Sequence, residues 1–310
     1  MFGRDKICGV VAAGDAVSMM RELAQALRLT RTVELRLDYL RDDAEISRFL
    51  RLLAAKKTRA TLIATCRRRE AGGLYRGSPS SQLIQLADAL RAGCTWYDLD
   101  METAEKCPSE LLDVLLGKGR RLISAHFFRR APKNLAPVAR SMARFRPDAI
   151  KIAAQCDSIA ESLRVLRLAH GHRNVVAIPM GEAALPARLL ALREGSALSY
   201  AAVETSTAPG QVTLAAAKEM YRADHIRRRT RVYGVIGDPI AHSLSPQLQN
   251  AGFRARRIDA VFLPFLVRDL RDFLAAIESL GISGFSVTIP HKQSIDRKST
   301  RLNSSHGIIW

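Results

Sequence analysis

The sequence has few of the features that mark secreted, membrane-bound or redox-active proteins. Its cysteines are odd in number and lack the Cys-x-x-Cys spacing of metal and redox motifs. They are Cys8, Cys66, Cys94, Cys107 and Cys156. No apolar run reaches the roughly 18 residues that a membrane helix needs, and residues 1–6 show no signal-peptide pattern. We therefore expect a cytoplasmic protein with free thiols and no membrane partner.

Acidic residues are scarce, because 30 aspartates and glutamates face 48 lysines and arginines, giving a net charge of +18. Clustered cations would indicate nucleic-acid binding. Here the basic residues are scattered along the chain, and only ten of them are lysines. This distribution favours a solvated basic surface suited to small anionic substrates, and predicts no nucleic-acid partner.

Short apolar runs alternate with stretches of helical period as far as about residue 222. The predicted strands are Ile7–Ala12, Val33–Tyr39, Ala60–Cys66, Trp96–Asp100, Arg121–Phe127, Ala149–Ala153, Val175–Pro179 and Leu198–Val203. Helical periods lie between them, for example over Met19–Leu27, Ser81–Leu90, Ser109–Leu116, Ile159–Leu168 and Ala187–Leu192. Eight strand and helix pairs in this length predict an α/β fold of the (β/α)8 barrel type over residues 1–224, with its chemistry at the carboxyl ends of the strands.

A second α/β pattern follows the barrel. Residues 225–231 are polar and are predicted to be a linker, and residues 232–295 alternate strand and helix again but are too few to complete a sheet. From residue 296 the apolar periodicity stops, and the string resembles a translated sequencing adapter. Residues 296–310 are therefore expected to be a non-native tail.

Two side chains on neighbouring barrel strands suggest imine chemistry. Lys151 stands in an apolar strand, where desolvation favours the neutral amine that can attack a carbonyl. His126 ends the preceding strand and could carry protons beside an imine. Each residue alone has a plainer explanation, namely a lysine that reaches solvent and a histidine that fills the core.

The second predicted strand carries three charges in alternation. Glu34, Arg36 and Asp38 are spaced by two, so their side chains would point to one face of the strand. Inside a barrel such charges are costly unless they pair with each other or meet a ligand.

Taken together, these residues resemble the type I 3-dehydroquinate dehydratases over about residues 7–221. The motifs that carry the resemblance occur in order: Glu34-Leu-Arg-Leu-Asp38, Ala64-Thr-Cys-Arg67 with Gly72-Gly73, Ser124-Ala-His126-Phe127, Lys151-Ile-Ala153, Met180-Gly181 before Arg188, and Ala208-Pro-Gly-Gln211. The resemblance implies that Lys151 forms an imine with the ketone of 3-dehydroquinate. It further implies that His126 moves the protons, and that no cofactor is needed.

The resemblance also assigns substrate-binding roles. The implied residues are Glu34, Arg36, Arg67, Arg188, Thr207 and Gln211, with Arg188 as the carboxylate clamp, because a guanidinium can donate two parallel hydrogen bonds. The chain departs from the family at Ala71, where a glutamate usually orients the histidine, so that role is open to Glu70 or another carboxylate. Thr207 replaces the usual serine, and Ala184 and Ala187 replace the usual glycine and serine.

Residues 233–246 and 284–292 resemble the substrate-binding half of shikimate dehydrogenases. By that resemblance Ser243, Ser245, Ser286 and Thr288 would hold shikimate or 3-dehydroshikimate, and Lys292 would assist proton transfer. The family uses NADP, but no glycine-rich turn after a strand is evident here. We therefore expect no dehydrogenase activity from this chain, and the barrel resemblance favours a homodimer.

Two alternatives remain open at this stage. Another Schiff-base barrel, such as a class I aldolase, would share Lys151 but not Arg188 or Gln211, and substrate tests with sugar phosphates would separate the two. A basic nucleic-acid-binding protein with a decayed barrel would instead bind DNA or RNA with a steep salt dependence.

Overall fold

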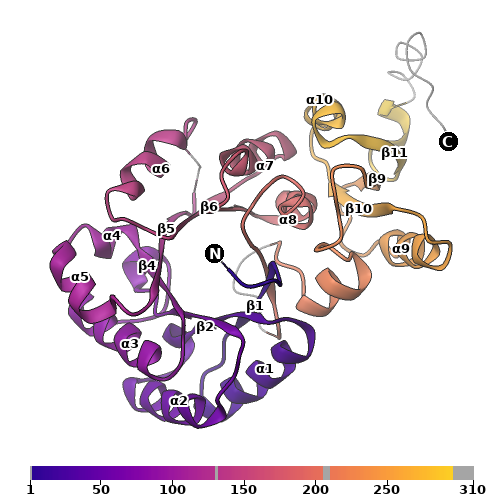
Figure 1. Cartoon of the computed structure of the whole chain (residues 1–310). Coiled ribbons are helices and arrows are strands. Elements are labelled where there is room, and N and C mark those ends of the chain that lie inside the picture. Colours follow the sequence, from indigo (N-terminus) through magenta and orange to yellow (C-terminus); the bar gives the residue numbers. More distant parts are fainter. Residues whose placement is uncertain (1, 130–131, 205–209, 296–310) are drawn as a thin grey trace.

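The computed structural model describes residues 2–129, 132–204 and 210–295 of the chain. Eight parallel strands form a nearly closed barrel inside a ring of helices (Figure 1), as the sequence predicts. The strands are β1 (Ile7–Val11), β2 (Thr32–Arg36), β3 (Thr61–Thr65), β4 (Trp96–Asp100), β5 (Arg120–Phe127), β6 (Ala149–Gln155), β7 (Val175–Met180) and β8 (Ser199–Ala202). Hydrogen bonds run in the order β7-β6-β5-β4-β3-β2-β1-β8, and β7 also lies beside β8.

The helices of the barrel are α1 (Ala16–Leu29), α2 (Asp43–Lys56), α3 (Pro79–Arg91), α4 (Met101–Ala104), α5 (Ser109–Leu116), α6 (Ala136–Ala143), α7 (Ile159–Leu166) and α8 (Leu185–Leu190). Short 3-10 turns η1 (Leu37–Tyr39), η2 (Arg69–Ala71), η3 (Arg167–Ala169) and η4 (Glu182–Ala184) and a π-helical segment η5 (Ala216–Met220) join them. Local signals set the helix ends: Asp15 caps α1 by accepting hydrogen bonds from the backbone of Val17 and Ser18. No helix among the described residues is both long and apolar enough to cross a membrane.

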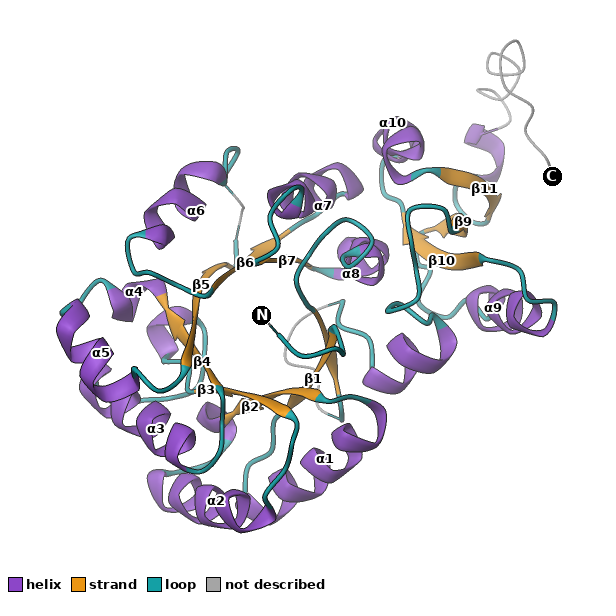
Figure 2. Ribbon diagram, viewed as in Figure 1, coloured by secondary structure: helices purple, strands orange, loops and turns teal. Residues whose placement is uncertain are grey.

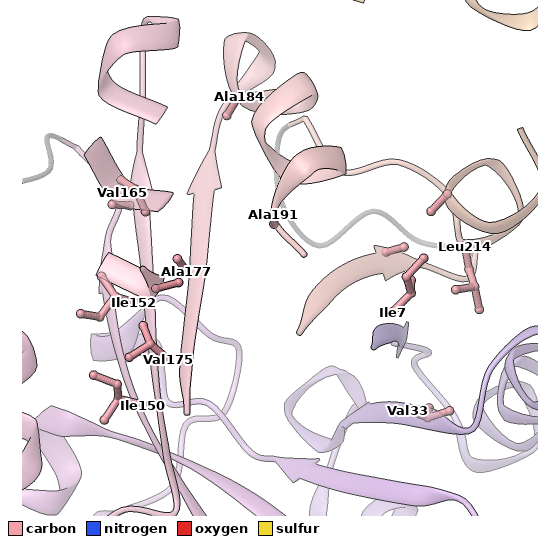
Figure 3. Packing of buried hydrophobic residues seen from close by; sticks show 14 of the residues in the cluster. Ile7, Val33, Ile150, Ile152, Val165, Val175, Ala177, Ala184, Ala191 and Leu214 are labelled. Atoms are coloured by element: carbon pink, nitrogen blue, oxygen red, sulfur yellow. The ribbon is translucent and has the colours of Figure 1, made fainter. Parts of the chain in front are cut away.

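Alternation along each strand separates two apolar regions. Ile150 and Ile152 of β6 and Val175 and Ala177 of β7 belong to the cluster packed between the strands and the helices (Figure 3). The residues between them face the barrel interior, which is why Lys151 points inward. The outer cluster therefore packs the strands against the helices, and inward-facing positions can carry polar side chains such as Lys151.

The amino-terminal end of the barrel is filled by apolar side chains. Phe2 is 6% exposed and stacks on Trp96 with ring centroids 4.1 Å apart. Leu122, Val176 and Leu198 belong to the same interior cluster. In Figure 2 the N-terminus lies within the ring of strands. With this end plugged, the polar residues occupy the opposite end, formed by the carboxyl ends of the strands.

The predicted second strand is too long. β2 ends at Arg36, and residues 37–39 form the turn η1, with Leu37 fully buried. Asp38 therefore does not continue the alternation of Glu34 and Arg36 along a strand. The backbone of Arg36, at φ −83° and ψ 79°, already leaves the extended conformation, and this change of direction accounts for the early end.

The second domain begins with a three-stranded parallel sheet in the order β10-β9-β11. Its elements are β9 (Arg231–Gly237), α9 (Ser245–Ala255), β10 (Ala260–Leu266), α10 (Leu270–Leu280) and β11 (Ile282–Val287). This confirms the second α/β pattern, although β9 already starts at the last residue of the predicted linker.

The second domain packs against α7 and α8 of the barrel (Figure 1). The backbone of Ile159 donates to Asp272 Oδ2 at 3.1 Å, and Arg193 Nη1 donates to the carbonyl oxygen of Leu280 at 2.9 Å. Ala183 of η4 packs in one buried cluster with Val235 and other apolar residues of the second sheet. The two domains therefore share an apolar contact as well as hydrogen bonds.

Candidate active site

Lys151 lies in the middle of β6, pairs in register with Ser124 of β5, and is only 3% exposed. Although β6 is otherwise largely apolar, the lysine forms ion pairs with two carboxylates. Its Nζ donates to Glu34 Oε1 at 3.0 Å and also contacts Asp98 Oδ2. The amine further lies 4.8 Å from the centre of the Tyr200 ring. The lysine is thus fixed at the centre of the barrel by β2, β4 and β8.

Asp98 of β4 connects these charges. Its Oδ1 accepts hydrogen bonds from Arg67 Nη2 at 2.9 Å and from Ser124 Oγ at 2.6 Å. Burial alone would favour the neutral acid, but the neighbouring Arg67, Lys151 and His126 lower the pKa of Asp98 below its usual range. Asp98 is therefore ionised at neutral pH and serves as the counter-ion that allows two cations to be buried together.

His126, at the carboxyl end of β5, contacts a guanidinium rather than a carboxylate. Arg67 Nη1 lies 2.8 Å from His126 Nδ1. Because a guanidinium can only donate, Nδ1 accepts, and the proton of the neutral ring then sits on Nε2. Burial and the positive charges of Arg67 and Lys151 lower the pKa of His126 well below its usual range. The imidazole is neutral at pH 7.

Glu70, the candidate for orienting His126, pairs with Arg68 instead. Its side chain is 66% exposed and pairs with Arg68 at 2.9 Å. The following Gly72 and Gly73 serve packing. A Cβ on Gly72 would lie 2.1 Å from the ring of Phe128, and one on Gly73 would lie 2.1 Å from the Arg67 carbonyl oxygen. Since Phe128 stacks on His126, with centroids 5.9 Å apart, the glycines let this loop close over the histidine and Arg67.

Glu34 and Arg36 both reach the interior from β2 but join different partners. Glu34 Oε1 accepts from Thr65 Oγ1 at 2.9 Å as well as from Lys151. Arg36 forms two hydrogen bonds with Asp38, at 2.9 and 2.8 Å. Burial opposes the charge of Arg36, yet the carboxylate of Asp38 raises the pKa of the guanidinium above its ordinary value. The three charges of this motif are thus all paired.

Arg188 of α8 is buried, 5% exposed, and has no carboxylate partner among the described residues. Its Nη2 donates to the carbonyl oxygen of Tyr200 at 3.3 Å and its Nη1 to that of Pro179 at 3.5 Å, while Nε has no partner. Burial lowers the pKa of Arg188 to about 10, so the group remains charged at pH 7. A buried charge of this kind needs an anion to compensate it.

The two remaining predicted barrel residues follow β8 in the sequence. Thr207 is outside the described residues. Gln211 is half-buried and precedes Thr213, which bridges to Ala202 at the end of β8. The segment that carries Gln211 therefore returns to the carboxyl end of the barrel.

The second-domain candidates gather at the carboxyl ends of β9 and β11. Ser243 and Ser245 precede or begin α9, and the Ser245 backbone donates to Ser243 Oγ at 3.4 Å. Thr288 follows β11 and donates from its backbone to Ile236 at 2.9 Å. Ser286 and Lys292 are exposed. These residues share one sheet edge but do not form a buried network like that of the barrel.

Sequence reasoning missed Asp98, Ser124, Thr65 and Tyr200 as parts of the site. A signal for Asp98 was present, because Asp98 and Asp100 alternate along β4 as Glu34 and Arg36 do along β2. Nothing in the sequence marks the Arg67 contact to His126, because the two residues are 59 positions apart.

Known proteins resemble this arrangement in sequence as well as in fold. Residues 7–228 match the family model of the type I 3-dehydroquinases. The chain therefore belongs to the type I 3-dehydroquinase family. Residues 235–305 match the shikimate dehydrogenase substrate binding domain. The barrel is therefore followed by a segment that matches a domain of a second enzyme family.

Among curated proteins, the chain is 29% identical over 294 residues to a chloroplastic bifunctional 3-dehydroquinate dehydratase/shikimate dehydrogenase of Arabidopsis thaliana, covering 93% of this chain and 48% of that protein. It is 53% identical over 72 residues to the NADP(+) shikimate dehydrogenase of Geobacter metallireducens, covering 23% of this chain and 25% of that protein. The chain thus spans at most about half the length of these relatives.

Solved structures support the fold. A type I 3-dehydroquinate dehydratase from Clostridium difficile has a TM-score of 0.60 at 21% identity, over 70% of this chain and 90% of that one. The dehydroquinate dehydratase and shikimate dehydrogenase structure from S. pombe has a TM-score of 0.57 at 19% identity, over 95% of this chain and 59% of that one. At such identities the likeness concerns the fold alone.

Proposed function

We propose that the barrel dehydrates 3-dehydroquinate to 3-dehydroshikimate and water through an imine on Lys151. The observation that carries this proposal is the buried amine paired with Glu34 and Asp98, beside a neutral imidazole on the adjacent strand. The membership of the chain in the type I 3-dehydroquinase family supports the dehydratase over an aldolase.

The first step needs a free amine at Lys151. Glu34, whose Oε1 accepts a hydrogen bond from Nζ at 3.0 Å, would take the ammonium proton, while Asp98 remains an anion beside Arg67. The amine then adds to the ketone carbon of the substrate, and the proton taken up by Glu34 returns to the carbinolamine hydroxyl, which leaves as water and gives the protonated imine. The positive charge of the protonated imine occupies the same position as the ammonium, beside Asp98.

The second step needs a free imidazole lone pair. In the structure Arg67 donates a hydrogen bond to Nδ1 of His126, so the lone pair of Nδ1 is occupied. The ring proton is then on Nε2, and in this tautomer Nε2 can donate a proton but cannot accept one. A substrate hydroxyl that binds Arg67 would draw the guanidinium away from Nδ1 and free the ring to change tautomer. His126 then removes the proton next to the imine carbon and returns a proton to the departing hydroxyl.

The remaining contacts suit the substrate. Arg188 would receive its carboxylate, since its charge is buried without a counter-ion. Arg36, Arg67, Thr207 and Gln211 would contact its hydroxyls and carboxylate. Hydrolysis of the product imine restores Lys151. No step requires a cofactor, and a homodimer through the barrel is part of this proposal.

For the second domain we propose binding of shikimate or 3-dehydroshikimate through Ser243, Ser245, Ser286 and Thr288, with Lys292 at the reacting oxygen. The names of the matching shikimate dehydrogenases include NADP(+) as the cofactor. The glycine that ends β9 does not fit a dinucleotide site: a Cβ on Gly237 would meet the Thr288 side chain at 2.5 Å, so this glycine serves packing. The proposal for the second domain is therefore limited to substrate binding and does not include hydride transfer.

Borohydride reduction in the presence of 3-dehydroquinate tests the mechanism. We expect the mass of one reduced substrate on Lys151, no label on Lys151→Ala, and normal labelling of Lys292→Ala. His126→Ala should still be labelled, while release of the ultraviolet-absorbing enone slows about 100-fold or more. Labelling of any other lysine would refute the imine at Lys151, and an unchanged rate for His126→Ala would reassign the proton transfer.

A further inference from the structure

A cavity of about 470 Å³ lies where the end of the barrel chain meets α9 and β10. We call it the junction cavity. Its basic lining residues are Arg222, His225, Arg227, Arg229, Arg254 and Arg257. They come from the stretch around the interdomain linker and from the end of α9, so the fold gathers cations that are far apart in the sequence. Among the described residues, none of them contacts Lys151 or the carboxylates paired with it.

The cavity has more positive than negative charge. Asp259 is the one carboxylate that lines it within the described part of the chain, and it already accepts from Thr230 Oγ1 at 2.7 Å and pairs with Arg229 at 3.4 Å. Arg254 donates to the carbonyl oxygen of Glu219, and Arg227 to that of Asp224 at 2.6 Å. These partners leave four of the five arginine charges uncompensated at the cavity.

Two of the five arginines that line the cavity, Arg222 and Arg257, have no side-chain partner among the described residues. Among the described residues, neither side chain forms a hydrogen bond or an ion pair. Their guanidinium groups are therefore available to an incoming anion, and each can present two parallel donors to a phosphate or carboxylate.

The backbone at the same two residues is in an unfavourable conformation. Arg222 has φ 50° and Arg257 has φ 54°, and each follows the C-cap of a helical segment, η5 and α9 respectively. Glycine is the usual residue at this position because it adopts positive φ without steric cost. An arginine here could serve the helix dipole, but neither guanidinium donates to a helix carbonyl. Strain at two unpartnered cations of one cavity points to a ligand.

Apolar side chains also line the cavity, beside the polar Thr230 and Asn250. Tyr221, Phe253 and Ile258 line the cavity together with the arginines. The volume is in the range of small-molecule sites, and the cavity is a partly open hollow between the end of the barrel chain and the second domain rather than a flat basic surface. Both features favour a small ligand over a nucleic-acid duplex, which needs an extended basic face.

We propose that the junction cavity binds a small organic anion in which a phosphate or carboxylate group is joined to an apolar ring. Arg222 and Arg257 hold the anionic group, and Phe253 and Ile258 contact the ring. The ligand would bridge the barrel and the second domain, because the lining comes from both.

Calorimetric titration of the 310-residue chain with phenyl phosphate, benzoate and inorganic phosphate at low ionic strength tests this site. We expect one equivalent of at least one aromatic anion to bind, about tenfold more tightly than inorganic phosphate. Phenyl phosphate and benzoate distinguish the two anionic groups. The titrations use the Arg188→Met background as well, so that binding in the barrel pocket is recognised by its loss there.

Glycine substitutions provide the sharpest variants. Arg222→Gly and Arg257→Gly each remove a cation and also relieve the positive φ, so affinity should fall about tenfold while the melting temperature of the free protein stays equal or rises. Arg146→Gly is the matched control, since Arg146 is exposed with φ 48° but does not line the cavity. It should show the same thermal effect with unchanged affinity.

The proposal is overturned if the double variant Arg222→Gly/Arg257→Gly binds the aromatic anions as the unaltered chain does. It is also overturned if inorganic phosphate binds as tightly as they do, because the apolar lining would then have no role. Arg222→Gln, which removes the charge but keeps a side chain at positive φ, replaces the glycine variant should the latter fail to fold.

Discussion

The two regions of this chain treat their polar residues in opposite ways. In the barrel, Lys151, Asp98 and Arg67 are each no more than 4% exposed and are joined in one network of hydrogen bonds and ion pairs. In the second domain, Ser286 and Lys292 are exposed at a sheet edge. The barrel can bury charges because strands from all sides supply partners, whereas the described three-stranded sheet is open and does not surround its polar residues.

This difference matters for stability as well as for chemistry. A buried charge that loses its partner destabilises the fold by several kcal/mol, whereas an exposed pair contributes little. Substitutions in the paired charges of the barrel site should therefore show large effects on folding and activity together. The second domain and the junction should show small effects on folding, so their binding properties can be changed separately.

The largest effect is expected for Asp98→Ala. It leaves the buried Lys151 and Arg67 without their shared counter-ion, and we expect a loss of about 3–5 kcal/mol in the free energy of unfolding. Urea unfolding followed by Trp96 fluorescence measures it, in a Trp310→Phe background so that Trp96 is the only tryptophan. Asp98→Asn keeps an acceptor for Ser124 and should lose less. Equal stability of Asp98→Ala and the unaltered chain would show that the cations do not depend on this carboxylate.

Arg188→Met should separate substrate binding from stability. Because Arg188 carries a buried charge without a carboxylate partner, replacing it with an apolar side chain should leave the free energy of unfolding equal or higher. The substrate would lose its clamp, so KM for 3-dehydroquinate should rise about tenfold to 100-fold with a smaller change in kcat. Steady-state kinetics on both proteins measure this. A destabilised variant with an unchanged KM would mean that the arginine serves the fold.

The pKa of His126 predicts how barrel stability depends on pH. Burial and two neighbouring cations keep the folded-state pKa well below the ordinary value, so the unfolded chain binds a proton near pH 6.5 that the folded chain does not bind. Stability is therefore present above about pH 6.5 and is lost as the pH falls, by up to about 1.4 kcal/mol per pH unit.

Comparison of the unaltered chain with His126→Asn between pH 5 and pH 7.5 isolates this effect, since the other titrating groups are common to both proteins. Asparagine can still accept from Arg67. The variant should lose less stability on acidification, and parallel curves would contradict the lowered pKa of His126. Asp98, whose pKa is also lowered, acts only near and below its ordinary range around pH 4 and does not enter this window.

Periodicity in the sequence was sufficient to predict the barrel, but not the pairing inside it. The eight strands follow from local apolar runs, and most of their ends lie within two residues of the prediction. The contact of Lys151 with Glu34 joins residues 117 positions apart, from β6 and β2 on different sides of the barrel. Such a contact exists only once the sheet has curved, and no spacing along the chain reports it.

The same limit applies to what surrounds each charge. The apolar neighbours of Lys151 in the sequence face the helices, so they indicated burial correctly but gave the wrong environment for its amine. Similarly, the arginines around residues 222–257 are scattered in the sequence, and only the packing of α9 beside the end of the barrel chain brings them to one cavity.

The smallest effect on folding is expected at the junction cavity, for Asp259→Asn. Its partner Arg229 is 85% exposed, so the ion pair contributes less than about 1 kcal/mol, and asparagine can still accept from Thr230. Removing the one carboxylate that lines the cavity in the described chain should nevertheless raise its affinity for phenyl phosphate a few-fold, since repulsion of the anion disappears. Calorimetry and a urea titration on the same variant check both parts. Weaker binding at unchanged stability would mean that Asp259 orients the arginines instead of opposing the anion, and large destabilisation would mean that this region resembles the barrel site after all.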